Sequence, residues 1–317
     1  MKRSAALLSA LTFACSPAAR DTATSSEPAN TSSSSAPESK YFSSPPRSAV
    51  PSGPQGESVR RGEAIFRETP RFASDFVGNG LSCRNCHLDD GRKANSGPLW
   101  AAWGMYPAYR KKNGHVNTMD ERLRGCFTYS MNASASKQGH APPPNDPILV
   151  DLQAYMAWLS KGISQGADYP GRGYPTLPKP AQKPSRERGK ALYATSCALC
   201  HGADGQGTKL GSGDYVFPPL WGPDSYNWGA GMHRINTAAG FIKANMPYGK
   251  GGTLTNQEAW DVALFINSHE RPKDPRGKGN LADTDAKYHD ENCTFGDEVD
   301  GRALGQGLPA KRSLAKR

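Results

Sequence analysis

The sequence has few hydrophobic residues. They make up 36% of its 317 residues, and the mean hydropathy is −0.67. Together with 34 Gly and 26 Pro, this composition makes a large β-sheet or helix-bundle core a poor prediction. The apolar run from Ala5 to Ala14 is too short to span a membrane. The chain also lacks a recognition helix, a zinc-finger spacing and an aromatic-rich basic platform. Its net charge of +10 therefore indicates attraction to anions in general rather than nucleic-acid binding.

A CxxCH motif occurs twice, at residues 83–87 and again at residues 197–201. In such a motif the two thiols form thioether bonds to a haem, and the histidine donates one axial nitrogen to the iron. A redox dithiol or half of a zinc site is the alternative for a single copy, and the repetition makes that alternative remote. The predicted haem-binding residues are Cys83, Cys86, His87, Cys197, Cys200 and His201.

Smaller features repeat around both motifs. A glycine and, four residues later, an aromatic residue precede each motif: Gly62 with Phe66, and Gly189 with Tyr193. On a helix the two share one face, where the glycine would admit a crossing helix and the aromatic ring would cover the haem edge. Pro-Leu-Trp follows each motif, and we expect the carbonyls of Pro98 and Pro219 to accept the second ring N–H of each histidine.

The repeat predicts an all-α protein with two class I cytochrome c domains in tandem, each wrapped around one covalently attached haem. The porphyrin supplies much of the apolar interior that the composition lacks. Six segments are expected: a signal peptide at residues 1–19, a disordered Ser/Pro/Thr-rich tether at 20–56, a first cytochrome c domain at 57–165, a Pro-rich linker at 166–184, a second cytochrome c domain at 185–270 and an irregular extension at 271–317.

The first residues predict export to the periplasm, which also suits thioether-linked haem. Two kinds of processing stay open. Cys15 stands where a lipoprotein signal would place its lipid-modified cysteine, and simple cleavage near Ala19 is the alternative. In the tail, Cys293 has no evident partner and is interpreted as an unpaired or incidental thiol.

Two helices carry clear capping signals. Asp146 followed by Pro147 predicts the start of the last helix of the first domain. Thr255 and Glu258 form a capping box that predicts the closing helix of the second domain. The apolar residues that follow both caps are interpreted as core positions.

The sixth iron ligand of the second haem is predicted to be Met246. It stands in a glycine-flanked loop before the last helix, and Pro247 fixes the backbone next to it. A thioether at this position is typical of electron-transfer haems and raises the reduction potential. Met232 and His233 are competing candidates, but they lie closer to the motif and lack the proline.

The first domain contains no Met-Pro pair. Its candidate ligands are Met105, His115, Met119, Cys126, Met131 and His140. We favour Cys126, whose thiolate would be an electron-donating ligand, with a buried free thiol as the alternative. The surrounding basic residues are Arg110, Lys111, Lys112, Arg122 and Arg124. These residues can stabilise a thiolate and bind oxyanions, although a solvated basic face is the alternative interpretation.

Residues 80–87 (GLSCRNCH), 97–100 (GPLW) and 122–127 (RLRGCF) together resemble the di-haem thiosulfate dehydrogenase family. The resemblance implies reversible coupling of two thiosulfates to tetrathionate, with a small cytochrome c as electron acceptor. It implies His87 and Cys126 as ligands of a catalytic haem, and His201 and Met246 as ligands of an electron-exit haem. Some members place an alternative lysine ligand just before that methionine, whereas this chain has Asn245. The residues that we expect to orient the substrates are Arg110, Lys112, Arg122 and Arg124.

Two other functions remain to be distinguished. A non-catalytic di-haem electron carrier would need methionine on both irons and no arginine-lined site. A haem subunit of a larger sulfur-oxidising complex would need a separate partner for activity. A spectrum showing thiolate on one of two haems would exclude the carrier, and turnover of thiosulfate by the isolated chain would exclude the dependent subunit.

Overall fold

The computed structural model describes residues 40–211 and 213–309. All of them belong to the same structural unit, Ser39–Arg317. Among these residues, no helix has the length and apolar character needed to cross a bilayer. The predicted signal peptide, Cys15 and most of the predicted tether lie outside the described residues.

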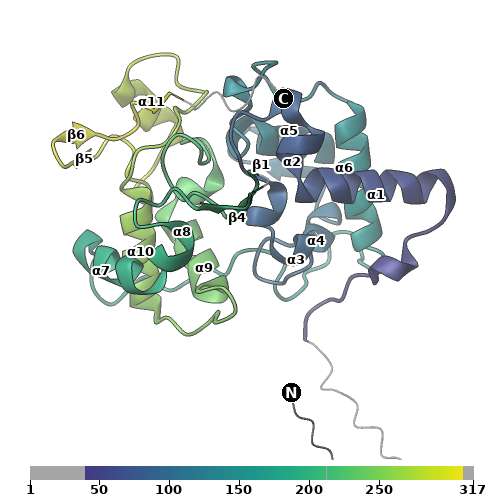
Figure 1. The fold of residues 1–317 in the computed structure, drawn as a ribbon, viewed down its shortest axis with the longest axis horizontal. Helices are drawn as coiled ribbons and strands as arrows, with labels where there is room; N and C mark the ends of the chain where they lie inside the picture. The colour runs from purple at the N-terminus through teal and green to yellow at the C-terminus, as the bar shows by residue number, and fades with distance from the viewer. Residues whose placement is uncertain (1–39, 212, 310–317) are drawn as a thin grey trace, which may run out of the picture. The chain divides into compact units, whose positions relative to one another are not determined.

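The structure is mostly helical, and Figure 1 shows the helices preceding residue 160 in purple to teal-blue and those of residues 186–267 in green. The first group comprises α1 (Gly53–Arg67), α2 (Thr69–Phe72), α3 (Leu88–Gly91), α4 (Leu99–Trp103), α5 (Met119–Tyr129) and α6 (Pro147–Leu159). The second group comprises α7 (Arg186–Ser196), α8 (Ala198–His201), α9 (Ile235–Asn245) and α10 (Asn256–Asn267). A further helix, α11 (Leu281–Tyr288), lies in the C-terminal extension.

Short 3₁₀ helices and hairpins connect these helices. The 3₁₀ helices are η1 (Arg47–Ala49), η2 (Ser74–Phe76), η3 (Cys83–Asn85), η4 (Ala133–Ala135) and η5 (Gly231–His233). The antiparallel strand pairs are β1 (Ala108–Arg110) with β2 (His115–Asn117), β3 (Thr208–Lys209) with β4 (Tyr215–Phe217), and β5 (Glu298–Val299) with β6 (Arg302–Ala303). No strand pair described here extends into a larger sheet.

The predicted helix caps are confirmed. The Asp146 side chain accepts a hydrogen bond from the Ile148 N–H at 2.9 Å, which begins α6 with proline at its first position. Thr255 and Glu258 form the reciprocal capping box that begins α10. Each cap satisfies backbone N–H groups that the helix itself leaves without acceptors.

The two glycines of the sequence repeat lie where helices cross. A Cβ atom on Gly62 of α1 would lie 2.0 Å from the carbonyl oxygen of Asp151 on α6. A Cβ atom on Gly189 of α7 would lie 2.1 Å from the carbonyl oxygen of Asp261 on α10. The prediction of close helix approach is therefore confirmed in both domains.

The arginine before each of these glycines forms an ion pair with the helix that crosses it. Arg61 donates two hydrogen bonds to the Asp151 carboxylate at 2.7 and 2.9 Å, and Arg188 donates two to Asp261 at 2.6 and 2.8 Å. Such bidentate pairs fix orientation as well as supplying energy. The Arg-Gly pair therefore forms the same helix–helix contact in each domain.

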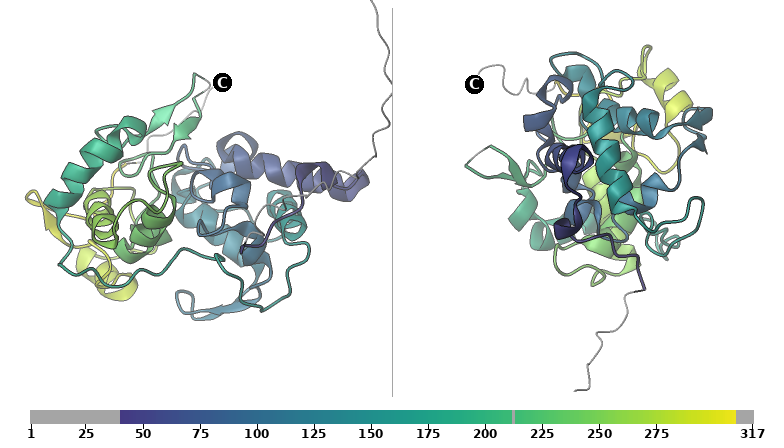
Figure 2. Two further views of the ribbon diagram at one scale, coloured as in Figure 1. Left: turned by 90° about the horizontal axis from the view of Figure 1, so that it is seen from below. Right: turned by 90° about the vertical axis from the view of Figure 1, so that its right-hand side faces the viewer.

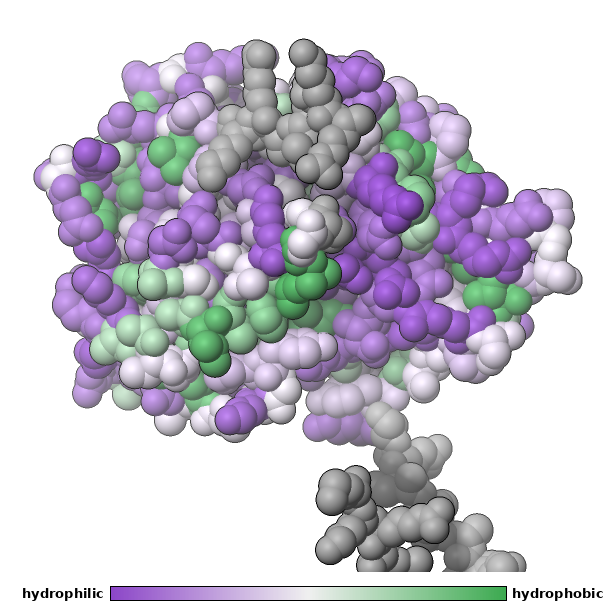
Figure 3. Space-filling model, in the orientation of Figure 1, coloured by the Kyte–Doolittle hydropathy of each residue, from purple (hydrophilic) through white to green (hydrophobic). Residues whose placement is uncertain are grey.

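Each helix group has its own hydrophobic core. The first core includes Phe66, Trp100 and Tyr155, all nearly fully buried, and the second includes Tyr193 and Trp260. Most of the face shown in Figure 3 is hydrophilic, and hydrophobic residues form separate groups on it. Two small hydrophobic cores agree with a composition too polar for one large core.

The linker and the tail are more closely packed than the sequence predicted. The linker accepts a hydrogen bond from Asn95 N through Gly171 O and one from Trp260 through Pro178 O, so it contacts both helix groups. In the left view of Figure 2 it runs as a long teal segment between them. The prediction of an irregular tail omitted α11.

The prediction of a disordered tether is wrong for residues 40–56. Phe42 packs against Trp100 with ring centroids 5.3 Å apart, η1 follows, and α1 begins at Gly53 rather than near residue 57. Composition alone could not reveal this packing, because it depends on distant residues: Phe42 and Val50 pack against the first core, and the Tyr41 hydroxyl accepts a hydrogen bond from Asn95.

Candidate functional site

The second CxxCH motif opens onto a large cavity. Cys197 precedes α8 and Cys200 and His201 end it, and all three line a cavity of about 650 Å³. This cavity extends to the first motif, since Arg84 and Cys86 line it as well. Met246, directly after α9, lines the same cavity. The fold thus brings the predicted axial histidine and the predicted axial methionine to one space, although 45 residues separate them (246 minus 201).

The rim of this cavity is apolar and poorly covered by protein. Leu210, Val216 and Tyr248 line it while remaining 54%, 43% and 65% exposed. A planar porphyrin attached to Cys197 and Cys200 would cover such side chains, and the cavity volume lies within the range of cofactor sites. The residues present therefore fit a c-type haem.

Both CxxCH histidines are held by backbone carbonyls. Nδ1 of His87 lies 2.6 Å from Gly97 O, and Nδ1 of His201 lies 2.9 Å from Pro218 O. Because a carbonyl can only accept, Nδ1 carries the proton in each ring and Nε2 keeps its lone pair for iron. Burial also lowers the pKa of both histidines, which favours the neutral ligand form.

The prediction that Pro98 and Pro219 supply these carbonyls is wrong by one residue. Pro98 O accepts instead from Ala102 N in α4, and Pro219 O accepts from the Ser225 hydroxyl. In both domains the carbonyl of the residue before the predicted proline, rather than the carbonyl of that proline, faces the imidazole. Sequence spacing could not distinguish two adjacent carbonyls.

The first CxxCH motif is half-buried and lies beside Cys126. Burial raises the pKa of Cys83 to about 12 and that of Cys86 to about 11, and the Cys126 sulfur adds to both shifts through its charge. The Thr69 hydroxyl lies 3.4 Å from the Cys83 sulfur. Cys126 therefore lies near the two thiols that would attach the first haem.

Cys126 has a basic partner on its own helix. Arg122 and Cys126 stand one turn apart on α5, and Nη1 of Arg122 donates to the Cys126 sulfur at 2.9 Å. Residues four apart on a helix share a face, so this contact follows from local geometry. The charge of the sulfur raises the pKa of Arg122, and burial opposes that shift.

Two more of the predicted basic residues lie in this region. Arg110 donates to the Tyr106 hydroxyl at 3.1 Å. The positive charges of Arg110 and Arg122 both contribute to lowering the pKa of Lys112. The Lys112 ammonium donates to Gly229 O at 2.6 Å. Desolvation and the nearby Arg276 charge lower the pKa of Lys112 to about 7, although the rest of its side chain is exposed. Lys112 is therefore a weaker cation here than the sequence implied.

Arg124 is not part of this cluster, which corrects its predicted role. Its Nε donates to Pro142 O at 3.1 Å. A residue two positions from both Arg122 and Cys126 faces another side of a helix. The position of a residue around the helix, rather than the number of basic residues nearby, therefore determines which side chain contacts the Cys126 sulfur.

The other candidate ligands of the first domain are placed elsewhere. Met119 and Met131 are buried in the first hydrophobic core, and Met105 is 38% exposed. His115 is exposed and lies 3.1 Å from a Glu121 carboxylate oxygen, and His140 is exposed with Nδ1 bonded to Ala141 O. None of these five has the contact with a buried guanidinium that Cys126 has.

Two aromatic residues of this site were absent from the sequence prediction. The charges of Tyr106 and Tyr174 raise the pKa of Arg122. Burial raises the pKa of Tyr174, with smaller contributions from the charges of Cys86 and Cys126. Tyr174 belongs to the linker, so only tertiary packing could bring it to the first domain.

The competitors of Met246 have separate environments. Met232 lines the same cavity but packs against the first core, and His233 is bonded through Nδ1 to Ala230 O at 2.5 Å. His233 lies with His289 and Cys293 in a cluster of possible metal ligands. Cys293 is an unpaired thiol, as predicted, but its sulfur has a contact that the sequence did not reveal, since it lies 3.3 Å from Nδ1 of His289.

The side chain of Asn245, the residue before Met246, is held by hydrogen bonds. Asn245 is fully buried, and its amide donates to Asn95 O at 2.9 Å and to Phe241 O at 3.0 Å. Asn95 lies in the first domain, so this side chain also joins the two helix groups. An amide held in this way orients the loop that carries Met246.

Comparisons with known proteins agree with the two-domain arrangement. The family "SoxA/TsdA, cytochrome c domain" matches residues 70–164, and the family "Cytochrome c" matches residues 186–270. The two matched families imply c-type haem as the cofactor.

Similar proteins cover most of the chain. It is 55% identical over 256 residues to a thiosulfate dehydrogenase of Stutzerimonas stutzeri (strain A1501), covering 80% of this chain and 81% of that protein. It is 52% identical over 259 residues to a thiosulfate dehydrogenase of Thiomonas intermedia (strain K12), covering 81% and 80%. The solved "as isolated" thiosulfate dehydrogenase (TsdBA) of Marichromatium purpuratum superposes with a TM-score of 0.82 at 53% identity, covering 84% of this chain and 58% of that one.

Proposed function

This chain belongs to the thiosulfate dehydrogenase family, and we propose that it joins two thiosulfate ions through a new S–S bond to form tetrathionate, with release of two electrons. The observation that carries the proposal is the Arg122–Cys126 contact at 2.9 Å beside the half-buried first CxxCH motif. A simple electron carrier has no use for a sulfur held by a buried guanidinium.

Two haems are proposed, one for each motif. Cys83 and Cys86 hold the first and Cys197 and Cys200 hold the second, each through two thioether bonds. Each haem supplies an iron that takes up one electron at a time, so two of them can store the electron pair. The chain's own contribution is to fix His87 and His201 in the tautomer that presents Nε2.

Cys126 is proposed as the distal ligand and reactive sulfur of the first haem. Arg122 places positive charge at that sulfur, and Arg110 adds positive charge in the same region, which would lower the repulsion between two thiosulfate dianions. Holding both anions near one sulfur also replaces a collision of like charges with a preformed arrangement. Lys112 contributes less charge near neutral pH, because its pKa is about 7.

Met246 is proposed as the distal ligand of the second haem. Its thioether would raise the reduction potential of this haem, and the Cys126 thiolate would lower that of the first, so the two ligands would favour the second haem as the site of electron exit. The buried amide of Asn245 holds the preceding residue to Asn95, which supports a fixed methionine ligand. A small cytochrome c then accepts the electrons, and the protein acts in the periplasm, either lipid-anchored at Cys15 or released by cleavage near Ala19.

Replacement of Cys126 tests this proposal. Cys126→Gly and Cys126→Met should retain both haems, measured by haem content per chain, and should lose thiosulfate oxidation with a cytochrome c acceptor. Thr128→Ala, two residues further on α5, is the control, because its hydroxyl only bonds back to Arg124 O. Wild-type turnover in Cys126→Gly would refute the role of Cys126 in the reaction.

A further inference from the structure

Three potential metal ligands meet between η5 and the segment that follows α11. They are His233, His289 and Cys293, and their ligand atoms all lie within 4.8 Å of one another. Neither CxxCH motif contributes a residue to this group. The three side chains come from the second domain and from the C-terminal extension, so the tertiary fold alone assembles them.

The outer ring nitrogen of each histidine faces an oxygen acceptor. Nδ1 of His233 lies 2.5 Å from Ala230 O, and Nε2 of His289 lies 3.2 Å from a carboxylate oxygen of Asp274, although not aligned as a hydrogen bond. Histidines that bind metals commonly place the second nitrogen against a carbonyl or carboxylate in this way. Nε2 of His233 and Nδ1 of His289 are then left as ligand atoms.

The sulfur completes the set. The Cys293 sulfur lies 3.3 Å from Nδ1 of His289 and accepts the Phe295 backbone N–H at 3.2 Å. Burial raises the pKa of the Cys293 thiol to about 11 and the Phe295 N–H opposes that shift, so a bound metal ion would displace the thiol proton. The ring of His289 is stacked on Phe295 with centroids 3.9 Å apart and planes 6° apart, so its orientation is fixed.

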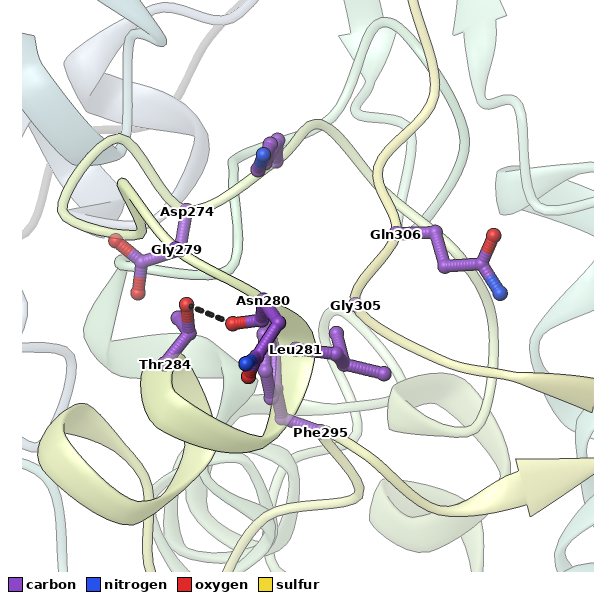
Figure 4. Close-up of a pocket in the computed structure, with 9 residues that line it drawn as sticks. Asp274, Gly279, Asn280, Leu281, Thr284, Phe295, Gly305 and Gln306 are labelled. Atoms are coloured by element: carbon purple, nitrogen blue, oxygen red, sulfur yellow. Dashed lines mark hydrogen bonds between the residues drawn. The ribbon is translucent and has the colours of Figure 1, made fainter.

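Aromatic rings enclose the group. Trp228 is fully buried and meets Phe295 edge-on, and the side chain of His289 has no exposed surface. Neither imidazole is therefore open to bulk water, since His233 is also buried. Asp274 and Phe295, which contact His289, also line a cavity of about 150 Å³ (Figure 4). In this view they reach the cavity from the segments before and after α11. Space for a small ion or water therefore adjoins the group.

We propose that His233, His289 and Cys293 bind one thiophilic transition-metal ion, zinc or copper, which fastens the C-terminal extension to the second domain. Two imidazoles and one thiolate are a donor set that both metals accept. Binding releases the thiol proton of Cys293 to solvent. The two segments are already joined by the Ile235 N to Asn292 O hydrogen bond at 2.7 Å and by the Arg234–Asp290 ion pair.

Metal content of the haem-loaded protein tests the proposal. After treatment with a chelator, which cannot remove thioether-linked haem, the protein is loaded in separate arms with Zn²⁺ or Cu²⁺, desalted and analysed by mass spectrometry of the elements. We expect about one ion per chain in the wild type and below about 0.1 in Cys293→Ser and His289→Gln. The stronger retention of one ion in competition identifies the metal. His115→Gln, which removes an exposed histidine, should bind like the wild type.

A second measurement uses the wild type alone, in case the variants do not fold. Bound metal should protect Cys293 from alkylation, measured on its peptide by mass spectrometry, and should raise the melting temperature. Equal binding by the wild type and Cys293→Ser would overturn the proposal. So would a wild type that binds neither ion and shows no protection of Cys293.

Discussion

Removal of the Arg122 guanidinium should impair the reaction without removing either haem. In Arg122→Gln the Cys126 sulfur loses the donor that lies 2.9 Å away. Arg122→Lys keeps the charge but loses the planar fork, so its defect should be smaller. The assay is thiosulfate oxidation with a cytochrome c acceptor, over a range of thiosulfate concentrations and ionic strengths.

The size of the effect follows from the type of contact. A hydrogen bond to a charged partner contributes about 1.5–3 kcal/mol, which corresponds to a decrease in kcat/KM of about 10- to 150-fold. If Arg122 acts mainly on the sulfur, kcat should fall while KM changes little. If it mainly holds thiosulfate, KM should rise and the salt dependence of kcat/KM should weaken.

Arg124→Gln is the matched control. It removes the same charge from the same helix, but Arg124 donates to Pro142 O and does not contact Cys126. Its kcat/KM should stay within about twofold of the wild type, because surface charge changes of this kind have small effects. Equal losses in the two variants would show that net charge, rather than the contact with sulfur, matters, and would refute the reasoning.

The other predictions concern the second haem, the helix crossings and acid stability. Met246→Lys should lower the reduction potential of one haem in a redox titration and leave the other unchanged, because a thioether raises the potential. Two unchanged potentials would indicate a different ligand. Gly62→Ala and Gly189→Ala should each lower the free energy of unfolding in urea by about 1–3 kcal/mol, because the new methyl group would overlap a carbonyl oxygen 2.0 or 2.1 Å away. Wild-type stability in either variant would show that the helices can separate freely. Desolvation lowers the pKa of His269 from 6.5 to about 4, and its ring stacks on Trp221. The unfolded chain therefore binds a proton that the folded chain resists, and stability should fall as the pH drops from 6.5 towards 4. His269→Phe should flatten the melting temperature across this interval, and an unchanged slope would contradict the assignment.

The sequence by itself determined the features that depend on neighbours along the chain. The CxxCH motifs, the caps at Asp146 and Thr255, and the glycines at both helix crossings needed only local spacing and chain chemistry. The repeat of these features also predicted two similar helical domains. Such features can be predicted from the sequence because the residues that signal them are close together along the chain.

Tertiary structure decided which distant groups meet. The path of the linker brought Tyr174 to the region of Arg122 and Cys126. The imidazole of His87 is hydrogen-bonded to the carbonyl of Gly97 rather than to that of Pro98.

The same distinction explains the tail. Cys293 had no evident partner in the sequence. His289 stands four residues before it in the same extension, but His233 approaches the pair only because the extension packs against η5. Composition and spacing describe what each segment can do, but the direction of a side chain depends on backbone geometry and packing between segments that are far apart in the chain.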